Sequence, residues 1–189
     1  MTTPPPARDR ILQAYEDLLI NDGARGATLD AVAAAAGVSK GGLLYHFKSK
    51  EALTAGLIAK LRELAEADFE GMRNDPAGPS DYYVRTSVLS GSTFDRALLA
   101  AMRLAQEDDS NVRAAFTDIH AEWYRLLLAD VGDAGVARAI MLIGDGLYYS
   151  AALYGLPSDG TLPARNAGDV SVASLLDIVE DLRARARGN

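Results

Sequence analysis

The hydrophobic positions of this 189-residue chain recur with the spacing of helices nearly from end to end. Apolar residues fall three and four positions apart, and no segment shows the sustained alternation of apolar and polar residues that is typical of strands. Glycine, proline and short polar runs separate the periodic segments. The sequence therefore predicts an all-α fold.

The first 73 residues contain four such segments, and the second shows the pattern most clearly. Its apolar residues follow the i, i+3, i+4, i+7 spacing of one buried face, and Thr28 precedes it as a natural N-cap. Gly23 is expected to end the first helix. In the third helix we expect Leu43, Leu44 and Phe47 to turn inward. The predicted helices span about 7–21, 29–36, 40–47 and 50–73.

A hinge or domain boundary is predicted at the segment NDPAGPS, residues 74–80, because proline and glycine interrupt the helical pattern there. The longest irregular stretch of the chain is expected at 154–169. Five further helices are predicted at about 80–90, 94–107, 111–130, 135–154 and 171–187.

The two short helices at 29–36 and 40–47 fit the plan of a helix-turn-helix. In that motif the first helix braces the second, which lies in the major groove of DNA. Gly37 joins them and can supply the left-handed backbone conformation that such a turn commonly needs.

The second of these helices begins with residues that stabilise a helix poorly, because Lys40 is followed by Gly41 and Gly42. A glycine inside a helix costs up to about 1 kcal/mol relative to alanine. At the amino end, however, the missing side chains let DNA approach closely, and unpaired N–H groups favour phosphate. Thr28 and Lys50, at the amino ends of the flanking helices, are expected to clamp phosphates. The predicted DNA-binding residues are Thr28, Ser39, Lys40, Gly41, Gly42, Tyr45, His46 and Lys50.

The net charge of −7 argues against nucleic-acid binding only until its distribution is considered. Residues 1–56 carry six basic and six acidic side chains, so the whole negative charge lies after residue 56. Three of the four lysines fall within residues 40–50. Because salt screens charges over about 8–10 Å, such a local basic spot can dock DNA despite an acidic body.

These residues resemble the TetR family of bacterial regulators. Its motifs read here as GVSKG at 37–41 with Leu43, and as FKSKEAL at 47–53. The resemblance implies a helix-turn-helix domain over residues 1–56 and a helical regulatory domain over 57–189. That second domain would hold a small-molecule pocket and dimerise through the last two helices. Where the family often carries a phosphate-binding tyrosine, this chain has Leu44, which leaves open which aromatic residue contacts the backbone.

The residues of the second domain partly support this expectation by themselves. The segment 136–153 is apolar nearly all round, and the last helix carries a wide apolar surface, as a four-helix dimer interface requires. An acid, Asp145, lies within the apolar segment; it could line a pocket, pair with an arginine or face solvent. Trp123 could likewise line the pocket or pack in the core. The candidate pocket residues are His120, Trp123, Tyr124, Asp145, Tyr148 and Tyr149.

Other functions are not expected. The chain has no cysteine and two histidines, and it lacks a Gly-rich phosphate loop and a G-x-S-x-G elbow, so we expect no enzyme, no cofactor and no metal. It also lacks a membrane-length apolar run and an apolar leader segment, which predicts a cytoplasmic protein with no membrane partner.

We therefore expect a homodimeric repressor that binds an inverted-repeat operator in double-stranded DNA and leaves it when a small molecule binds. The alternatives are a ligand-independent regulator or an activator, and a helical enzyme or protein-interaction module.

Overall fold

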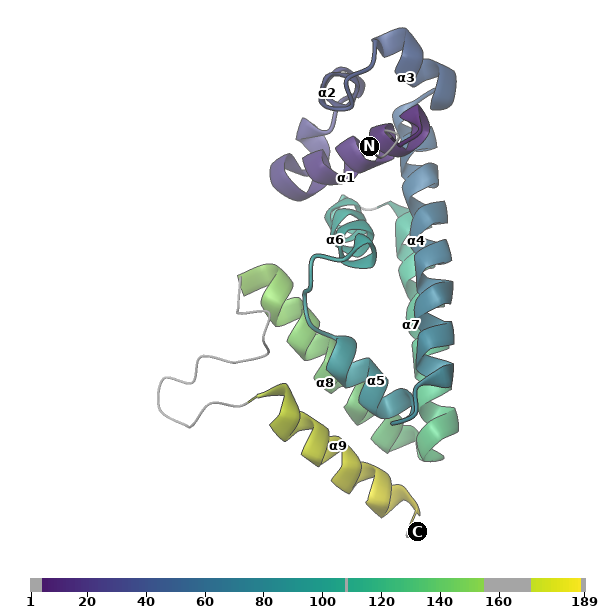
Figure 1. Cartoon of the computed structure of the whole chain (residues 1–189), viewed down its shortest axis with the longest axis vertical. Coiled ribbons are helices and arrows are strands. Elements are labelled where there is room, and N and C mark those ends of the chain that lie inside the picture. Colours follow the sequence, from purple (N-terminus) through teal and green to yellow (C-terminus); the bar gives the residue numbers. More distant parts are fainter. Residues whose placement is uncertain (1–4, 108, 155–170, 188–189) are drawn as a thin grey trace. The chain divides into compact units, whose positions relative to one another are not determined.

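The computed structural model describes residues 5–107, 109–154 and 171–187, and all regular structure within them is helical (Figure 1). The predicted all-α fold class is confirmed. All but the first residue of the predicted irregular stretch at 154–169 lies outside the described residues. The helices are α1 Ala7–Gly26, α2 Leu29–Ala35, α3 Lys40–His46, α4 Lys50–Asn74, α5 Pro79–Thr86, α6 Thr93–Ala105, α7 Ser110–Val131, α8 Ala134–Tyr154 and α9 Val172–Arg187.

The chain divides into two compact units, each built from two segments of the sequence. The first unit contains residues 1–64 and 91–117, and the second contains 65–90 and 118–189. The helix α6 therefore belongs with α1–α3, although it follows α5 in the chain.

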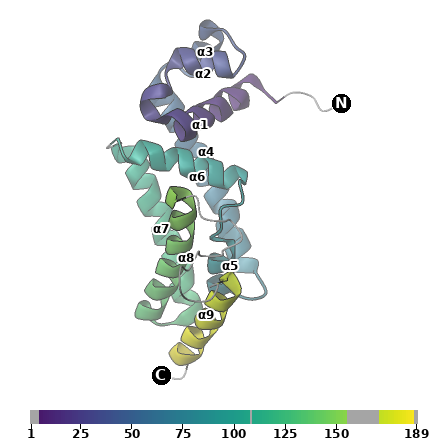
Figure 2. The ribbon, with the colours of Figure 1, turned by 90° about the vertical axis from the view of Figure 1, so that its left-hand side faces the viewer.

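In the first unit, α1 packs against α2, α3 and α6 (Figure 2). The core is aliphatic and aromatic, and burying each such side chain contributes about 1.5–3 kcal/mol. The predicted interruption at Gly23 is confirmed, because this residue is not helical, with φ of 72° and ψ of −178°. A short helical segment follows this kink and extends α1 to Gly26. The fully buried core residues of the unit include Ile11, Tyr15, Leu19, Leu43, Leu53 and Leu57.

The expectation that Leu44 turns inward is wrong, because this side chain is exposed. Leu43 is buried on the inner face of α3, and Phe47, which directly follows the helix, is buried as well. Residue 44 lies about 100° around the helix from Leu43, so it leaves that face.

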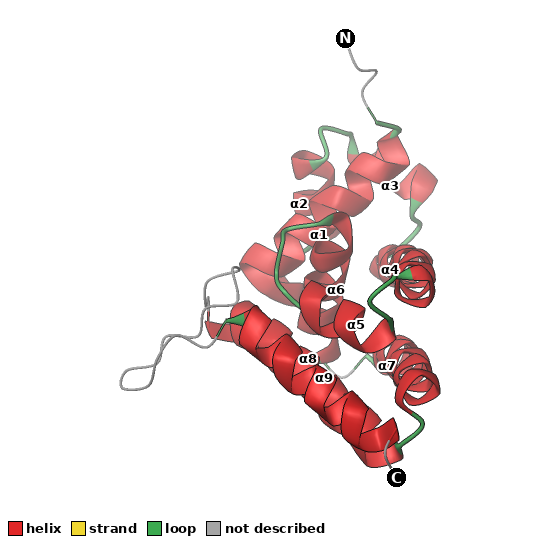
Figure 3. Ribbon diagram, turned by 60° about the horizontal axis from the view of Figure 1, so that its bottom comes forward, coloured by secondary structure: helices red, strands yellow, loops and turns green. Residues whose placement is uncertain are grey.

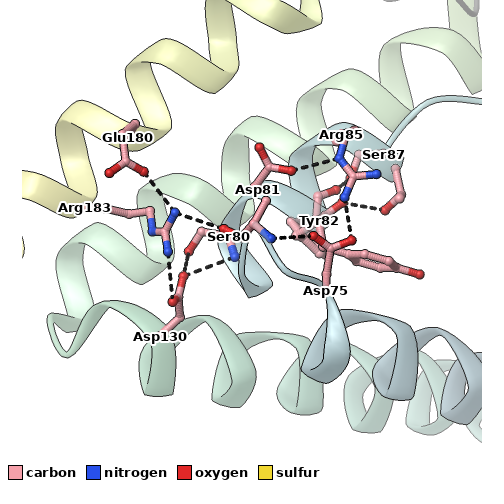
Figure 4. Close-up of polar contacts among 12 residues, drawn as sticks. Asp75, Ser80, Asp81, Tyr82, Arg85, Ser87, Asp130, Glu180 and Arg183 are labelled. Atoms are coloured by element: carbon pink, nitrogen blue, oxygen red, sulfur yellow. Dashed lines mark hydrogen bonds and ion pairs between the residues drawn. The ribbon is translucent and has the colours of Figure 1, made fainter.

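In the second unit, α5 packs against α8 and α9, which also pack against each other (Figure 3). A polar network holds the end of α9 in place (Figure 4). In it, Arg183 pairs with Asp130 at 3.3 Å and donates to the carbonyl of Ala77 at 3.1 Å. Within the described ranges, no helix is both long enough and apolar enough to cross a membrane.

Candidate nucleic-acid interface and effector site

The α2–α3 motif is fixed by two side-chain caps and a glycine turn. The Thr28 hydroxyl accepts a hydrogen bond from the N–H of Ala31 at 3.2 Å, and the Ser39 hydroxyl accepts one from the N–H of Gly42 at 3.0 Å. Between the helices Gly37 has a φ of 65°, which glycine adopts without strain. Local residues thus define where each helix begins and how sharply the chain turns.

The face of α3 that does not pack on the core is open to solvent. Lys40 and Gly41 are exposed at its amino end, and His46 is exposed at its carboxyl end. Tyr45 is 84% exposed and its ring lies edge-to-face on His46, with centroids 5.1 Å apart. A side chain this exposed adds little to the core, and its hydroxyl and ring are open to solvent.

Two of the predicted DNA-binding lysines have protein partners in this structure. The Lys40 ammonium lies 3.0 Å from the Asp30 carboxylate. The Lys50 ammonium donates to the carbonyl of Ala24 at 2.5 Å, so it joins the start of α4 to the last turn of α1. A phosphate contact by Lys50 stays a prediction, and it would require the amine to leave this carbonyl.

The scaffold behind the motif is tied by polar contacts as well as by the core. Buried Glu16 pairs with Lys60 at 2.7 Å, and Tyr15 shares a hydrogen bond with Thr54 at 3.0 Å. These contacts join α1 to α4 within the first unit. They fix the helix on which α2 and α3 rest.

In the second unit, the indole of Trp123 is surrounded by aromatic and acidic groups. Its N–H donates to the Asp68 carboxylate at 2.8 Å. The rings of Phe69, Tyr83 and His120 meet it edge-on, with centroids 6.1, 5.6 and 5.2 Å away. Such edge-to-face pairs add about 0.5–1.5 kcal/mol each to the energy of burial.

Asp145 extends this arrangement on α8. It accepts a hydrogen bond from the Tyr83 hydroxyl at 2.8 Å, and the Nδ1 atom of His120 lies 4.0 Å away. No arginine or lysine pairs with Asp145 or Asp68 within the described residues. We call Asp68, Tyr83, His120, Trp123 and Asp145 the acidic–aromatic cluster.

Burial and charge shift the pKa values of this cluster. Burial raises the pKa of the Tyr83 hydroxyl, and the Asp145 carboxylate raises it further. Burial also raises the pKa of Asp68. The hydrogen bonds that this carboxylate accepts from Trp123 and Tyr82 lower its pKa, but the effect of burial is larger. For His120, burial lowers the pKa and Asp145 opposes that shift. The site therefore disfavours extra negative charge and leaves His120 neutral more readily than a free imidazole.

The structure brings together three of the six predicted pocket residues, namely His120, Trp123 and Asp145. Tyr149 is half-buried, and its pKa is raised by burial and by Asp145, while the ring of Tyr148 lies 6.4 Å from that of Tyr149. Tyr124 lies elsewhere: its hydroxyl donates to the carbonyl of Ala134, and Arg138 covers its ring at 4.5 Å.

Sequence reasoning missed Asp68 and Tyr83, which come from the α4 and α5 segments. The signal that could have found Asp68 is a carboxylate placed directly before the apolar Phe69 on the buried stripe of a helix. No group of three or more histidine, aspartate or glutamate side chains that could hold a metal ion occurs in the described part of the chain.

Comparisons with known proteins match two separate parts of the chain. Residues 11–57 match the family described as bacterial regulatory proteins, tetR family. Residues 78–165 match the tetracyclin repressor-like C-terminal domain. Among curated proteins, the chain is 36% identical over 89 residues to the HTH-type transcriptional regulator RutR of Escherichia coli (strain K12). This match covers 46% of the chain and 42% of RutR, so the chain spans about two fifths of that relative's length.

Solved structures show the same fold over nearly the whole chain. A transcriptional regulator from Streptomyces coelicolor A3(2) has a TM-score of 0.65 at 22% identity, covering 95% of this chain and 99% of its own. The multidrug binding protein EbrR complexed with malachite green has a TM-score of 0.67 at 22% identity, covering 94% and 98%. With the amino-terminal helix-turn-helix and the helical carboxyl-terminal part both matched, the chain belongs to the TetR family of bacterial regulatory proteins.

Proposed function

We propose that the protein is a homodimeric transcriptional repressor that binds operator DNA through α3 and releases it when an organic cation binds the second unit. The observation that carries this proposal is the exposed face of α3, with a lysine and two glycines at one end and Tyr45 and His46 at the other. Its partner being DNA, the protein would act in the cytoplasm.

The division of labour follows the predicted domains, with residues 1–56 reading DNA and residues 57–189 regulating it. Support comes from the two family matches, which fall at 11–57 and 78–165. The predicted contacts are Lys40 with a base edge or phosphate, and Tyr45 and His46 with phosphates.

Dimerisation is supported by large apolar side chains that the chain leaves open on α8 and α9. Leu142 and Leu153 are 61% and 54% exposed, and Ile178 on the neighbouring helix is 47% exposed. A second copy meeting these two helices would bury them in a four-helix arrangement.

The proposed effector class follows from the acidic–aromatic cluster. Two carboxylates without a lysine or arginine partner, set among Trp123, Tyr83 and His120, suit a ligand that combines aromatic surface with positive charge. EbrR, which has a similar fold, was solved in complex with malachite green, and this supports an organic cation as the class of ligand.

Release would be a shift between two populations of the protein. The ligand must bind the form that cannot hold DNA more tightly than the form that can. Moving the equilibrium from 1:99 to 99:1 requires a difference of about 5.5 kcal/mol.

The DNA proposal is tested by selecting bound duplexes from a random pool. We expect an inverted repeat with half-sites about one helical turn apart, because a two-fold dimer presents two copies of α3. Lys40→Ala should weaken binding to the selected duplex by about tenfold or more if the lysine contacts a base. Recovery of no preferred sequence would contradict the proposal.

The effector proposal is tested through Trp123, the only tryptophan of the chain. The cationic dye malachite green should quench its fluorescence and lower the affinity for the selected duplex. Asp145→Asn should weaken dye binding about tenfold, or about 1.4 kcal/mol. Asp177→Asn, an exposed acid on α9, is the matched control. Equal quenching by a neutral dye of the same shape would contradict the charge requirement.

A further inference from the structure

Arg8 is held beside the carboxyl end of α3 although it belongs to the first turn of α1. Its guanidinium carbon lies 5.2 Å from the centre of the Phe47 ring, in the geometry of a cation–π contact. Phe47 directly follows α3 and is buried, whereas Arg8 is exposed. The ring thus holds a cation whose side chain stays exposed to solvent.

Lys48 adds a second cation at the same end of the helix, because it directly follows Phe47 and is exposed. Neither Arg8 nor Lys48 has a carboxylate or a hydrogen-bond acceptor among the residues that the structure describes. We call this pair the basic rim.

The other cations around α3 are already engaged. Lys40 pairs with Asp30, Lys50 donates to Ala24, and Arg10 donates to the carbonyls of Ala36 and Pro5. Each of these side chains would give up a protein contact to reach DNA. On binding DNA, Arg8 and Lys48 would lose only bound water, and Arg8 would also lose part of its contact with the Phe47 ring.

The spacing of these charges matches the groove that α3 is proposed to enter. The seven residues of α3 span about 10 Å, and the major groove is about 12 Å wide with phosphates along both edges. Lys40 stands at one end of the helix and the basic rim at the other. We infer that Arg8 and Lys48 bind backbone phosphates at the edge of the groove that faces the carboxyl end of α3.

This inference rests on the proposed DNA-binding function and adds to it two residues outside the α2–α3 motif. Phosphate contacts fix the register of a protein on the duplex without reading sequence. They also release counterions, so each contact steepens the dependence of affinity on salt. The basic rim should therefore raise the affinity for all duplexes by the same factor, whatever their sequence.

The test compares Arg8→Ala and Lys48→Ala with Arg103→Ala in the full chain. Arg103 is an exposed arginine of the first unit that lies on α6, which packs on α1 rather than on α3 (Figures 1 and 2). Fluorescence anisotropy would measure the dissociation constant for the selected duplex and a scrambled duplex between about 0.05 and 0.2 M salt.

We expect Arg8→Ala and Lys48→Ala each to reduce the slope of log affinity against log salt by about 0.9 per bound protomer. Each should weaken binding about five- to tenfold at about 0.1 M salt, equally for both duplexes. Arg8→Lys should keep most of the slope because it keeps the charge. Arg103→Ala should keep the slope of the parent protein.

Slopes of both rim variants equal to that of Arg103→Ala would overturn this inference and leave the proposed function standing. A parent protein that binds no duplex would overturn both. Should Arg8→Ala melt early through loss of its ring contact, Lys48→Ala decides the question, because its ammonium has no hydrogen bond or ion pair with any residue that the structure describes.

Discussion

Lys40 and Asp30 form an ion pair of 3.0 Å that joins the first residue of α3 to the first turn of α2. Their side chains are 57% and 71% exposed. A pair so open to water contributes at most about 1 kcal/mol, so it can open when Lys40 meets another acceptor. In the proposed complex, Asp30 would compete with DNA for the lysine and would repel nearby phosphates.

Asp30→Asn should therefore tighten binding to the selected duplex, by a factor of about two to five, with no change in melting temperature. The matched control is Glu107→Gln, which removes an exposed acid from the turn that follows α6. Titrations at one salt concentration would compare the three proteins. An Asp30→Asn variant that binds no better than Glu107→Gln would show that the pair does not restrain Lys40.

Gly41 gives a second prediction, in which stability and DNA affinity change in opposite directions. A Cβ added at Gly41 would meet only the Ser39 hydroxyl, at 4.0 Å, and Gly41 does not have a positive φ. Gly41→Ala should therefore stabilise the helix by up to about 1 kcal/mol and raise the melting temperature by about 2–4 °C. It should also weaken DNA binding, because the methyl group stands where the duplex is proposed to approach. A variant that is more stable and binds DNA unchanged would contradict the need for a bare helix tip.

The α2–α3 motif could be predicted because its signals are local. Thr28 and Ser39 each accept a hydrogen bond from the N–H three residues ahead, so capping depends on nearest neighbours in the sequence. The same holds for Gly37, whose positive φ the turn requires. Within this motif, the exposure of Leu44 was not predicted, because the sequence alone does not say how wide the buried face of a seven-residue helix is.

The acidic–aromatic cluster could be predicted only in part, because its contacts join distant segments. Asp68 meets Trp123 across 55 positions, and Tyr83 meets Asp145 across 62. The three predicted pocket residues that lie in the cluster, His120, Trp123 and Asp145, stand out in the sequence as polar or aromatic exceptions on apolar helices. No local signal says which helices pack together, and so their partners on α4 and α5 could not be named.

Two glycines of α8 provide a matched pair for testing the packing of the second unit. A Cβ at Gly144 would lie 2.5 Å from the Tyr83 ring and 2.7 Å from the Ser87 hydroxyl, whereas one at Gly146 would meet nothing within 4 Å. Gly144→Ala should destabilise by about 1–3 kcal/mol, because α5 must move away. Gly146→Ala should stabilise by up to about 1 kcal/mol. Thermal melting followed by circular dichroism would compare them, and equal melting temperatures would contradict the close approach of α5 to α8.

The Arg183 network provides the last test, because the same arginine pairs with one nearly buried and one exposed acid (Figure 4). The Asp130 side chain is 11% exposed and also accepts hydrogen bonds from the backbone N–H and hydroxyl of Ser80, at 3.2 and 2.5 Å. The Glu180 side chain is 60% exposed and pairs with Arg183 at 2.9 Å.

Removing Asp130 takes the buried acceptor from Arg183, which keeps its contacts with Glu180 and the carbonyl of Ala77, and leaves the two donors of Ser80 without their acceptor. Asp130→Ala should therefore cost about 3 kcal/mol. The melting temperature should then fall by about 6–12 °C. Glu180→Gln should cost less than about 1 kcal/mol, because water replaces the exposed contact. Since Arg183 holds α9 to the start of α5, Asp130→Ala should also weaken the proposed dimer, which light scattering over a dilution series would report. Equal stability of the two variants would show that the pairing with Asp130 does not fix α9.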